Sequence, residues 1–395
     1  MKSDFLHPTT RGGQIRTLEM LRCLHQRHEV HYVAFREPGE TEGLLRSSEY
    51  CTSAYPIDFH LPPKSSWRFR AQILQGLLDP LPGAVGRFRS AAMRETVRRL
   101  CSSEKFDCVV CDFLLPSINL PTMQGVVLFQ HNVETMIWLR RAQNARNILE
   151  RAYLNLQARR MQRLEARVCR AAACVVAVSP VDAEMMRSRF GIAHVVDVPT
   201  GVNVEYFTPP VEAPAPDNDL IFVGSMDWAP NVDAVLYFVR EILPVIRRKR
   251  PQCGLIIAGR DPVPEVQQLA RQDPLIQVTG TVDDVRPFLW RSAVSIVPIR
   301  VGGGTRLKIY EAMAARVPMV STHVGAEGLA AEHPAEIRLA NNPTDFAAQC
   351  LELLESPELR AATASAAWNL VYERFSWQKV TKQFEAILMG SAASD

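Results

Sequence analysis

A glycine-rich segment with two basic residues leads into a predicted helix in the second half of the chain. It reads Gly302-Gly303-Gly304-Thr305-Arg306-Leu307-Lys308-Ile309-Tyr310-Glu311. Glycines lack a Cβ and let the backbone approach a ligand, and the backbone N–H groups at a helix start form a cradle for an anion. Arg306 and Lys308 lie where the helix dipole disfavours positive charge, which favours a binding role over a stabilising one. The segment therefore predicts a phosphate or pyrophosphate site.

Glu311 is the second unusual residue of this segment, because it lies among apolar residues on a helix that the pattern predicts to be buried. A buried carboxylate needs a partner. It can pair with Lys308, three residues earlier, for roughly 0.2–0.5 kcal/mol, or it can accept hydrogen bonds from a ribose diol. The residues by themselves leave both alternatives open.

The elements that position these residues follow a regular alternation. Short apolar runs separated by segments with helical spacing lie at residues 31–35, 108–111, 125–129, 174–178, 220–223, 255–258, 276–278, 294–297 and 319–321. Such runs are typical of strands buried on both faces of a parallel sheet, whose carboxyl ends carry the ligand-facing loops. An α/β fold with parallel sheets is expected.

Two domains are expected, because 395 residues exceed the roughly 250–300 at which one hydrophobic core stops growing. A proline-rich stretch interrupts the alternation and reads as a linker. The predicted parts are a first domain at 1–207, the linker at 208–219, a second domain at 220–375, and a helix at 376–390 that packs back on the first domain. Before the first glycine loop the chain offers only Phe5-Leu6, after the polar Lys2-Ser3-Asp4, so either the first strand is short or the chain begins partway along it.

Several further stretches accompany the glycine-rich segment. They are the Gly12-Gly13 loop, Gln130-His131-Asn132-Val133-Glu134, Val178-Ser179-Pro180, Pro199-Thr200-Gly201-Val202-Asn203, Phe222-Val223-Gly224-Ser225, Ala258-Gly259-Arg260, Val278-Thr279-Gly280-Thr281-Val282 and Val317-Pro318-Met319-Val320-Ser321. Together with the segment ending at Glu311, this ordered set resembles the family 4 glycosyltransferases of the GT-B superfamily (glycosyl transferases group 1). The resemblance extends over nearly the whole chain.

The resemblance implies a GT-B fold, with two Rossmann-like domains and an interdomain cleft. It implies transfer of a hexose from a UDP- or GDP-sugar with retention at the anomeric carbon. By carry-over, Glu311 would hold the nucleotide ribose and His131 would face the donor sugar, unless His131 is a loop histidine bonded to backbone. The donor would also contact a set of small residues, Gly12, Gly13, Gly224, Gly302, Gly303, Gly304 and Thr305.

Two positions depart from the family pattern. The family often has acids spaced Glu-x7-Glu, and the first of them falls on Gly303, which leaves the identity of the donor sugar open. Many members also have an arginine and a lysine after the first strand of the second domain, where this chain reads Gly224-Ser225-Met226-Asp227-Trp228-Ala229-Pro230-Asn231. Arg306 and Lys308 are the expected substitutes, and with helix N–H groups they would stabilise the departing diphosphate.

No metal and no cofactor beyond the nucleotide-sugar co-substrate are predicted. An Asp-x-Asp at a strand end would indicate a divalent cation on the diphosphate, and the one match, Asp217-Asn218-Asp219, falls in the linker. Cys108 and Cys111 form a C-x-x-C inside an apolar run without a second pair, which favours buried thiols over a metal site.

Charge distribution bears on partners and location. Residues 1–210 are net positive and residues 211–395 net negative. The first half carries arginines on one helix-forming stretch, at Arg140, Arg141, Arg146, Arg151, Arg159, Arg160, Arg163, Arg167 and Arg170. Such a face can bind anionic lipid headgroups or a phosphate-bearing acceptor, or it can be a solvated helix. With no apolar run long enough to span a bilayer and no secretion signal, a cytoplasmic protein is expected, with peripheral contact at the inner membrane face.

The predicted acceptor is a saccharide or a polyprenyl-linked saccharide, in cell-surface polysaccharide synthesis. Nucleic acid is not a predicted partner, because the arginines lack interleaved aromatic residues. Two other functions remain open at this point. One is a sugar-nucleotide epimerase or hydrolase on the same fold, for which Glu134 is the nearby acid/base candidate. The other is a degenerate nucleotide-sugar-binding scaffold, a role that Gly303 favours.

Overall fold

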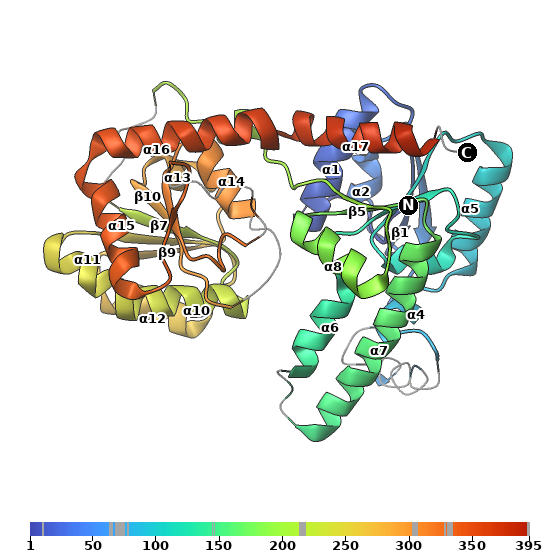
Figure 1. Cartoon of the computed structure of the whole chain (residues 1–395), viewed down its shortest axis with the longest axis horizontal. Helices are drawn as coiled ribbons and strands as arrows, with labels where there is room; N and C mark the ends of the chain where they lie inside the picture. Colours follow the sequence, from blue (N-terminus) through green and yellow to red (C-terminus); the bar gives the residue numbers. More distant parts are fainter. Residues whose placement is uncertain are drawn as a thin grey trace. The chain divides into compact units, whose positions relative to one another are not determined.

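The computed structural model describes residues 1–9, 12–62, 66–67, 76, 79–143, 145, 147–212, 219–301, 307–327, 329 and 335–392. The chain forms two compact units, one of Met1–Pro199 with Val380–Asp395 and the other of Thr200–Lys379 (Figure 1). Each unit is built on parallel sheet, which confirms the expected α/β class with two parallel-sheet domains. The expected linker at 208–219 is described at 208–212 and at 219 only, and the expected domain boundaries stay predictions.

The first unit alternates strands and helices. Its elements in chain order are α1 (Gly12–His25), β1 (His31–Arg36), α2 (Glu42–Leu45), η1 (Ser47–Glu49), β2 (Ser53–Asp58), α4 (Gly83–Gly86), α5 (Ala91–Ser103), β3 (Val109–Asp112), η2 (Leu115–Asn119), β4 (Val126–Phe129), α6 (Glu134–Gln143), α7 (Ile148–Ala171), β5 (Cys174–Ala177), α8 (Pro180–Phe190) and β6 (Val195–Asp197). Helix α17 (Trp377–Ala392) begins in the second unit and ends in the first.

Parallel pairing joins β1 to β2 and orders the remaining strands β3-β4-β5-β6. Met1 and Lys2 connect these two sheets. The N–H of Lys2 donates to Val33, the terminal amino group of Met1 donates to Val110, and the carbonyl of Met1 accepts from the N–H of Asp112. The place of a central strand is therefore taken by Met1 and Lys2, so the described first strand is short.

The second unit contains α9 (Val204–Phe207), β7 (Leu220–Val223), α10 (Ala229–Tyr237), η3 (Phe238–Ile242), α11 (Leu243–Lys249), β8 (Leu255–Ala258), α12 (Pro264–Gln272), β9 (Ile276–Gly280), α13 (Arg286–Trp290), β10 (Val294–Val297), α14 (Leu307–Ala314), β11 (Met319–Ser321), β12 (Arg338–Leu339), α15 (Pro343–Glu355), α16 (Pro357–Leu370) and η4 (Val371–Phe375). Its parallel sheet has the order β12-β11-β10-β7-β8-β9, and helices lie on both sides of it (Figure 1).

The apolar runs predict the central strands well. β7, β8, β10 and β11 have the expected bounds, and their residues are almost all buried in one continuous core. The pattern did not predict the strands β2, β6 and β12, which are short or half-exposed and therefore carry little apolar signal. The backbone approaches itself closely just after β7 and β8. A Cβ on Gly259 would lie 1.7 Å from the carbonyl oxygen of Gly224. Only glycine fits there.

Candidate functional site

In the second unit, the predicted donor residues divide between described and undescribed parts of the chain. Gly302, Gly303, Gly304, Thr305 and Arg306 lie outside the described residues. Gly224 follows β7, and both Lys308 and Glu311 lie on α14. The structure therefore positions the second half of the glycine-rich segment and its neighbours across the sheet.

Lys308 lies directly beside Gly224. Its Nζ donates to Oδ1 of the buried Asn231 at 3.0 Å and lies 4.3 Å from the centre of the Phe222 ring. A Cβ on Gly224 would lie 2.7 Å from this Nζ and 2.6 Å from Nδ2 of Asn231. A side chain at residue 224 would displace the Lys308 ammonium or the Asn231 amide, so the glycine leaves room for Lys308 and Asn231 to meet at the end of β7.

Glu311 lies one turn further along α14 and is half-buried. Burial raises the pKa of its carboxyl group and outweighs the nearby Lys308 ammonium, which lowers it, so that the pKa is about 7. Within the described part of the chain, no group donates a hydrogen bond to this carboxylate. A carboxylate held out of water without donors is a candidate acceptor for the hydroxyls of a ligand.

Arg260 adds a cation at the same edge of the sheet. It follows β8, and its Nε donates to the hydroxyl of Ser225 at 2.8 Å. Asn231 in turn donates to the carbonyl of Ser225 at 2.9 Å. We did not predict a role for Asn231 or Arg260. The available signal was a basic side chain directly after a strand, where parallel sheets place their ligand-binding loops.

In the first unit, His131 follows β4 and is held by Asp112, the last residue of β3. Its Nε2 lies 2.7 Å from Oδ1 of Asp112, and both side chains are buried. Burial lowers the pKa of His131 to about 4, although Asp112 raises it in part. The imidazole is therefore neutral near pH 7. With its proton on Nε2 toward the carboxylate, Nδ1 carries a lone pair that can accept a hydrogen bond.

Lys2 and Thr17 complete a buried cluster around Asp112. The Lys2 side chain donates to Oδ2 of Asp112 at 2.7 Å and to the hydroxyl of Thr17 at 2.9 Å, with only 1% of the residue exposed. Burial by itself raises the pKa of Asp112, but Lys2 and His131 together hold it well below its usual range. The carboxylate is thus ionised, with a cation on one oxygen and a neutral imidazole on the other.

The glycine loop of the first unit lies against this histidine. The Phe113 ring stacks on the His131 ring with centroids 3.9 Å apart, and a Cβ on Gly13 would lie 2.9 Å from Phe113 and 3.6 Å from Nδ1 of His131. Gly12 is exposed at the first position of α1. The structure thus brings Gly13 and His131 together at a helix start, where N–H groups point outward.

We did not predict Lys2, Thr17 or Asp112 as members of this cluster. Asp112 carried a usable signal, since it is an acid at the carboxyl end of a predicted strand, like His131 on the neighbouring strand. Lys2 carried a misleading one, because a lysine before the first loop suggests a solvated residue. Burial of Lys2 depends on its pairing with Asp112, which is distant in sequence.

Glu134 has a different environment from that of Glu311. It begins α6, where the buried carboxylate of Glu165 accepts from the N–H groups of Glu134 and Thr135, each at 2.8 Å. Burial, and to a smaller extent the Glu165 carboxylate, raise the pKa of the Glu134 carboxyl to about 7. Glu165 therefore serves as the cap of α6, and Glu134 is the side chain there that can exchange a proton near neutral pH.

Among the described residues, no group of three or more histidine, cysteine, aspartate or glutamate side chains is placed to hold a metal ion. Of the Asp-x-Asp in the expected linker, only Asp219 is described, and it accepts from the N–H of Gly254 at 3.1 Å. Metal independence stays a prediction. In the same described part of the chain, no helix is both long enough and apolar enough to cross a bilayer.

Solved structures share this architecture. Sucrose-phosphate synthase from Thermosynechococcus elongatus superposes with a TM-score of 0.71 at 15% identity, covering 100% of this chain and 98% of that one. HepE from Anabaena, in complex with UDP-glucose, superposes with a TM-score of 0.65 at 13% identity, covering 98% of each. A glycosyltransferase from Rickettsia africae gives 0.63 at 14% identity, covering 100% and 98%. The fold is of the GT-B glycosyltransferase type.

Family models match both units. The model for Glycosyltransferase Family 4 matches residues 10–206, and that for Glycosyl transferases group 1 matches residues 217–356. The chain belongs to the group 1, family 4-like glycosyltransferases, as the ordered motifs predicted.

A more specific relative is an uncharacterised 44.6 kDa protein from the cps region of Klebsiella pneumoniae, 22% identical over 169 residues. That match covers 41% of this chain and 44% of the relative, so the chain spans less than half the length of the curated relative it matches.

Proposed function

We propose that this glycosyltransferase moves a hexose from a UDP- or GDP-sugar to a saccharide or lipid-linked saccharide, with retention of anomeric configuration and without a metal. The observation that carries the proposal is the half-buried Glu311 carboxylate, without a described donor, one turn from the Lys308 ammonium. A neighbouring acceptor and cation suit a ribose diol and its diphosphate. HepE, which has the same fold, has been solved with UDP and with UDP-glucose.

Each predicted site residue has a role in this proposal. Glu311 accepts hydrogen bonds from the ribose. Lys308 and Arg306 bind the diphosphate with the backbone N–H groups of a small-residue set, Gly302, Gly303, Gly304 and Thr305, and Gly224 leaves room for Lys308. His131 accepts a hydrogen bond from a donor-sugar hydroxyl through Nδ1, while Gly12 and Gly13 approach the diphosphate from the first unit.

Retention would follow from attack on the same face as the departing diphosphate. The acceptor oxygen bonds to the anomeric carbon, the bond from that carbon to the phosphate oxygen breaks, and the phosphate takes the acceptor's proton. Lys308 and Arg306 stabilise the charge that develops on the diphosphate, so the chemistry needs no divalent cation. We place the reaction in cell-surface polysaccharide synthesis, which the relative from a cps region supports.

A ligand screen followed by a turnover assay tests the proposal. One UDP- or GDP-sugar should raise the melting temperature by several degrees, since binding to the native state alone stabilises it. With EDTA present, the same compound should release its nucleoside diphosphate slowly, and NMR of a glycosylated acceptor should show the donor's anomeric configuration. An inverted product would contradict retention, and loss of turnover in EDTA would contradict metal independence.

Two observations favour other functions, and the same assay separates them. Gly303 in place of an acid favours a binding scaffold, for which a donor would stabilise the protein without turnover on any acceptor. The raised pKa of Glu134 favours an epimerase or hydrolase, for which a free epimerised or hydrolysed sugar would form faster than any glycoside.

A membrane surface is the proposed site of the acceptor. Helices α6 and α7 pack side by side in the first unit (Figure 1), and α7 carries an exposed row of arginines, Arg151, Arg159, Arg163, Arg167 and Arg170. Ile148 and Leu149, each 84% exposed, begin the same helix. At 3.6 residues per turn they share the side of α7 that carries the arginines. Exposed apolar side chains beside a basic face suit an anionic bilayer.

Vesicle co-sedimentation tests this surface. At low salt the protein should bind vesicles that contain phosphatidylglycerol and should not bind pure phosphatidylcholine. The double variant Ile148→Ser with Leu149→Ser should bind at least about tenfold more weakly, because each apolar side chain contributes about 1.5 kcal/mol or more when buried. Leu45→Ser, which removes a leucine of similar exposure (78%) from α2, is the matched control. Equal binding by the double variant and the control would contradict the proposal.

A further inference from the structure

Phe113 has a backbone conformation that phenylalanine rarely adopts. It follows β3, and its φ of 72° lies in the left-handed region, where Cβ crowds the backbone. Its N–H donates to the carbonyl of Phe129 at 2.8 Å, so the pairing with β4 continues through this residue before the chain turns into η2. A glycine would make the same turn without strain. A phenylalanine at this position therefore needs a compensating gain from its side chain.

Among the described residues, Phe113 is not part of the apolar core of its unit. It is half-buried, whereas Cys111 before it and Leu114 after it are fully buried in that core. Its ring instead stacks on the imidazole of His131, with centroids 3.9 Å apart and planes 18° apart. The ammonium group of Lys2 lies 4.3 Å from the centre of the same ring. The gain from the Phe113 side chain thus comes from polar neighbours.

The left-handed backbone brings Phe113 to the same neighbours as Asp112. In an extended strand, successive side chains point to opposite faces of the sheet. Asp112 contacts Lys2 and His131, and the Phe113 ring contacts the same two residues. A Cβ on Gly13 would lie 2.9 Å from Cζ of Phe113, so the ring also requires the glycine of the α1 loop. The strain at residue 113 therefore places an aromatic ring in the buried cluster around Asp112.

The ring adds a constraint on His131 that the carboxylate cannot supply. Asp112 holds Nε2 of the imidazole at 2.7 Å, but a single hydrogen bond leaves the imidazole free to turn about it. A stacked aromatic ring fixes the plane of the imidazole and excludes water from that face. The hydrogen bond and the stack together fix the direction of Nδ1.

We propose that Phe113 is a positioning residue for His131, whose strained backbone holds its ring against the imidazole so that Nδ1 keeps one direction and stays a hydrogen-bond acceptor. The inference rests on the proposed function for the contact of Nδ1 with a donor-sugar hydroxyl. The positioning itself can be measured in the ligand-free protein. If the wild type turned over no donor, the proposed function would fail, and the NMR experiment below would still decide the role of Phe113.

Phe113→Gly separates positioning from packing, because it removes the ring and the strain together. Its melting temperature should stay within about 3 °C of the wild type, since the strain that it relieves offsets the contacts that it loses. Its kcat/KM for release of the nucleoside diphosphate should still fall about tenfold or more, because His131 is no longer held in place. Full activity of Phe113→Gly would overturn the proposal.

Two further variants show whether the ring or only its volume matters. Phe113→Leu fills a similar volume without a flat ring and should lose kcat/KM as the glycine variant does. Phe113→His keeps a flat ring and, assayed at pH 8, should retain most of kcat/KM. Wild-type activity of Phe113→Leu would show that residue 113 only fills space, and so would equal losses in the leucine and histidine variants.

NMR of the histidine ring nitrogens tests the positioning without a ligand. In the wild type, His131 should show one protonated and one unprotonated nitrogen, as expected of a single tautomer. In Phe113→Gly the two resonances should move toward each other, and the pKa of His131 should rise, because burial keeps it low. The charged groups that face the imidazole, Asp112, Lys2 and Arg16, are retained in this variant. Unchanged resonances and an unchanged pKa would overturn the proposal.

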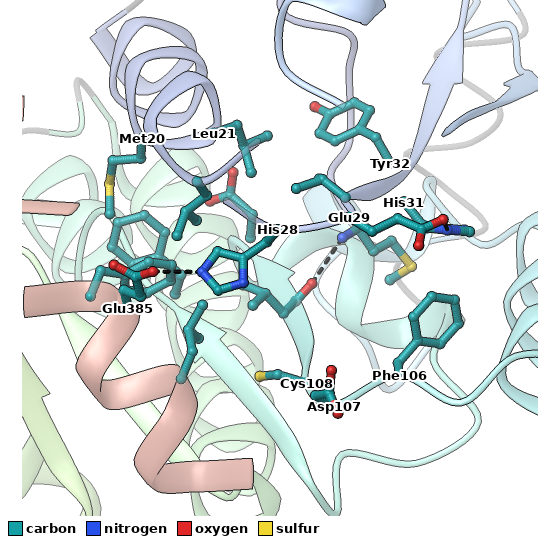
Figure 2. Close-up of a pocket in the computed structure, with 18 of the residues that line it drawn as sticks. Met20, Leu21, His28, Glu29, His31, Tyr32, Phe106, Asp107, Cys108 and Glu385 are labelled. Atoms are coloured by element: carbon teal, nitrogen blue, oxygen red, sulfur yellow. Dashed lines mark hydrogen bonds and ion pairs between the residues drawn. The ribbon is translucent and has the colours of Figure 1, made fainter. Parts of the chain in front are cut away.

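Glu385→Gln is the matched control for the NMR experiment, because it changes another histidine–carboxylate contact of the first unit. Figure 2 shows Glu385 of α17 beside His28, whose Nε2 lies 2.6 Å from the carboxylate. The two residues line a cavity together with Asp107 and Cys108, which precede β3, whereas Phe113 follows it (Figure 2). The control should shift the His28 resonances and leave His131 and kcat/KM unchanged. A shift of His131 as large as in Phe113→Gly would contradict a specific role of Phe113.

Discussion

Replacing Asp112 with asparagine is expected to destabilise the protein by about 3–5 kcal/mol and to lower kcat/KM by about 10- to 100-fold. The carboxylate is buried and contacts both Lys2 and His131. Removing one member of a buried ion pair leaves the other charge uncompensated, which accounts for the loss of stability. The loss of activity has another cause. An asparagine amide no longer fixes the proton of His131 on Nε2, so Nδ1 is no longer reliably an acceptor for the sugar.

A double-mutant cycle separates the two effects. Lys2→Met keeps the length of the side chain and removes its charge, so the double variant Lys2→Met with Asp112→Asn should recover part of the stability. It should not recover kcat/KM, because His131 would still lack its carboxylate. Chemical denaturation and steady-state kinetics measure the two quantities. Recovery of both would show that Asp112 acts only by neutralising Lys2.

The sequence predicts the second unit better than the first for a physical reason. Strands buried on both faces are continuous apolar runs, so β7, β8, β10 and β11 could be bounded to the residue. Edge strands such as β2 are half-exposed, and β2 contains Pro56, so their composition resembles that of a loop. Met1 and Lys2 are too short a segment to show a pattern, and their pairing with Val33 and Val110 is visible only in the fold.

The candidate site shows the same division between local and long-range signals. Lys308 and Glu311 could be predicted because each is unusual for its local position. Lys308 is a cation near a helix start, and Glu311 is an acid among apolar residues. Asn231 and Asp112 violate no local rule, because their roles come from partners more than fifteen residues away, Lys308 and His131. Local sequence patterns can thus indicate which residues bind a ligand. The residues that position them can be recognised only when the pairing of the strands is known.

Replacing Glu311 with glutamine is expected to stabilise the ligand-free protein at pH 8 while weakening donor binding. Burial raises the pKa of Glu311 from 4.5 to about 7, so ionising it in the folded protein costs free energy. The amide avoids that cost, and the gain should be about 3 kcal/mol. Donor affinity should fall by about 10- to 100-fold, because an ionised acceptor contributes about 1.5–3 kcal/mol to hydrogen bonds with the ribose.

The stability difference between wild type and Glu311→Gln should depend on pH. Below pH 4.5 the carboxyl is protonated in both the folded and the unfolded chain, so wild type and variant should differ little. Between pH 4.5 and 7 the unfolded chain releases the proton first, so the wild type loses stability relative to the variant as pH rises. Above pH 7 the difference should be constant. Donor affinity of the wild type should increase from pH 6 to 8, because only the carboxylate can accept from both ribose hydroxyls.

Denaturation at pH 5 and pH 8 and calorimetric titration with the donor measure these effects. Glu355→Gln, at the exposed end of α15, is the matched control and should change neither quantity. A variant that lost stability at pH 8 would show that the Glu311 carboxylate is satisfied within the protein, and unchanged donor affinity would remove it from the ribose site. Gain of stability with loss of affinity is the combination expected of a carboxylate that is held without protein donors in order to meet a ligand.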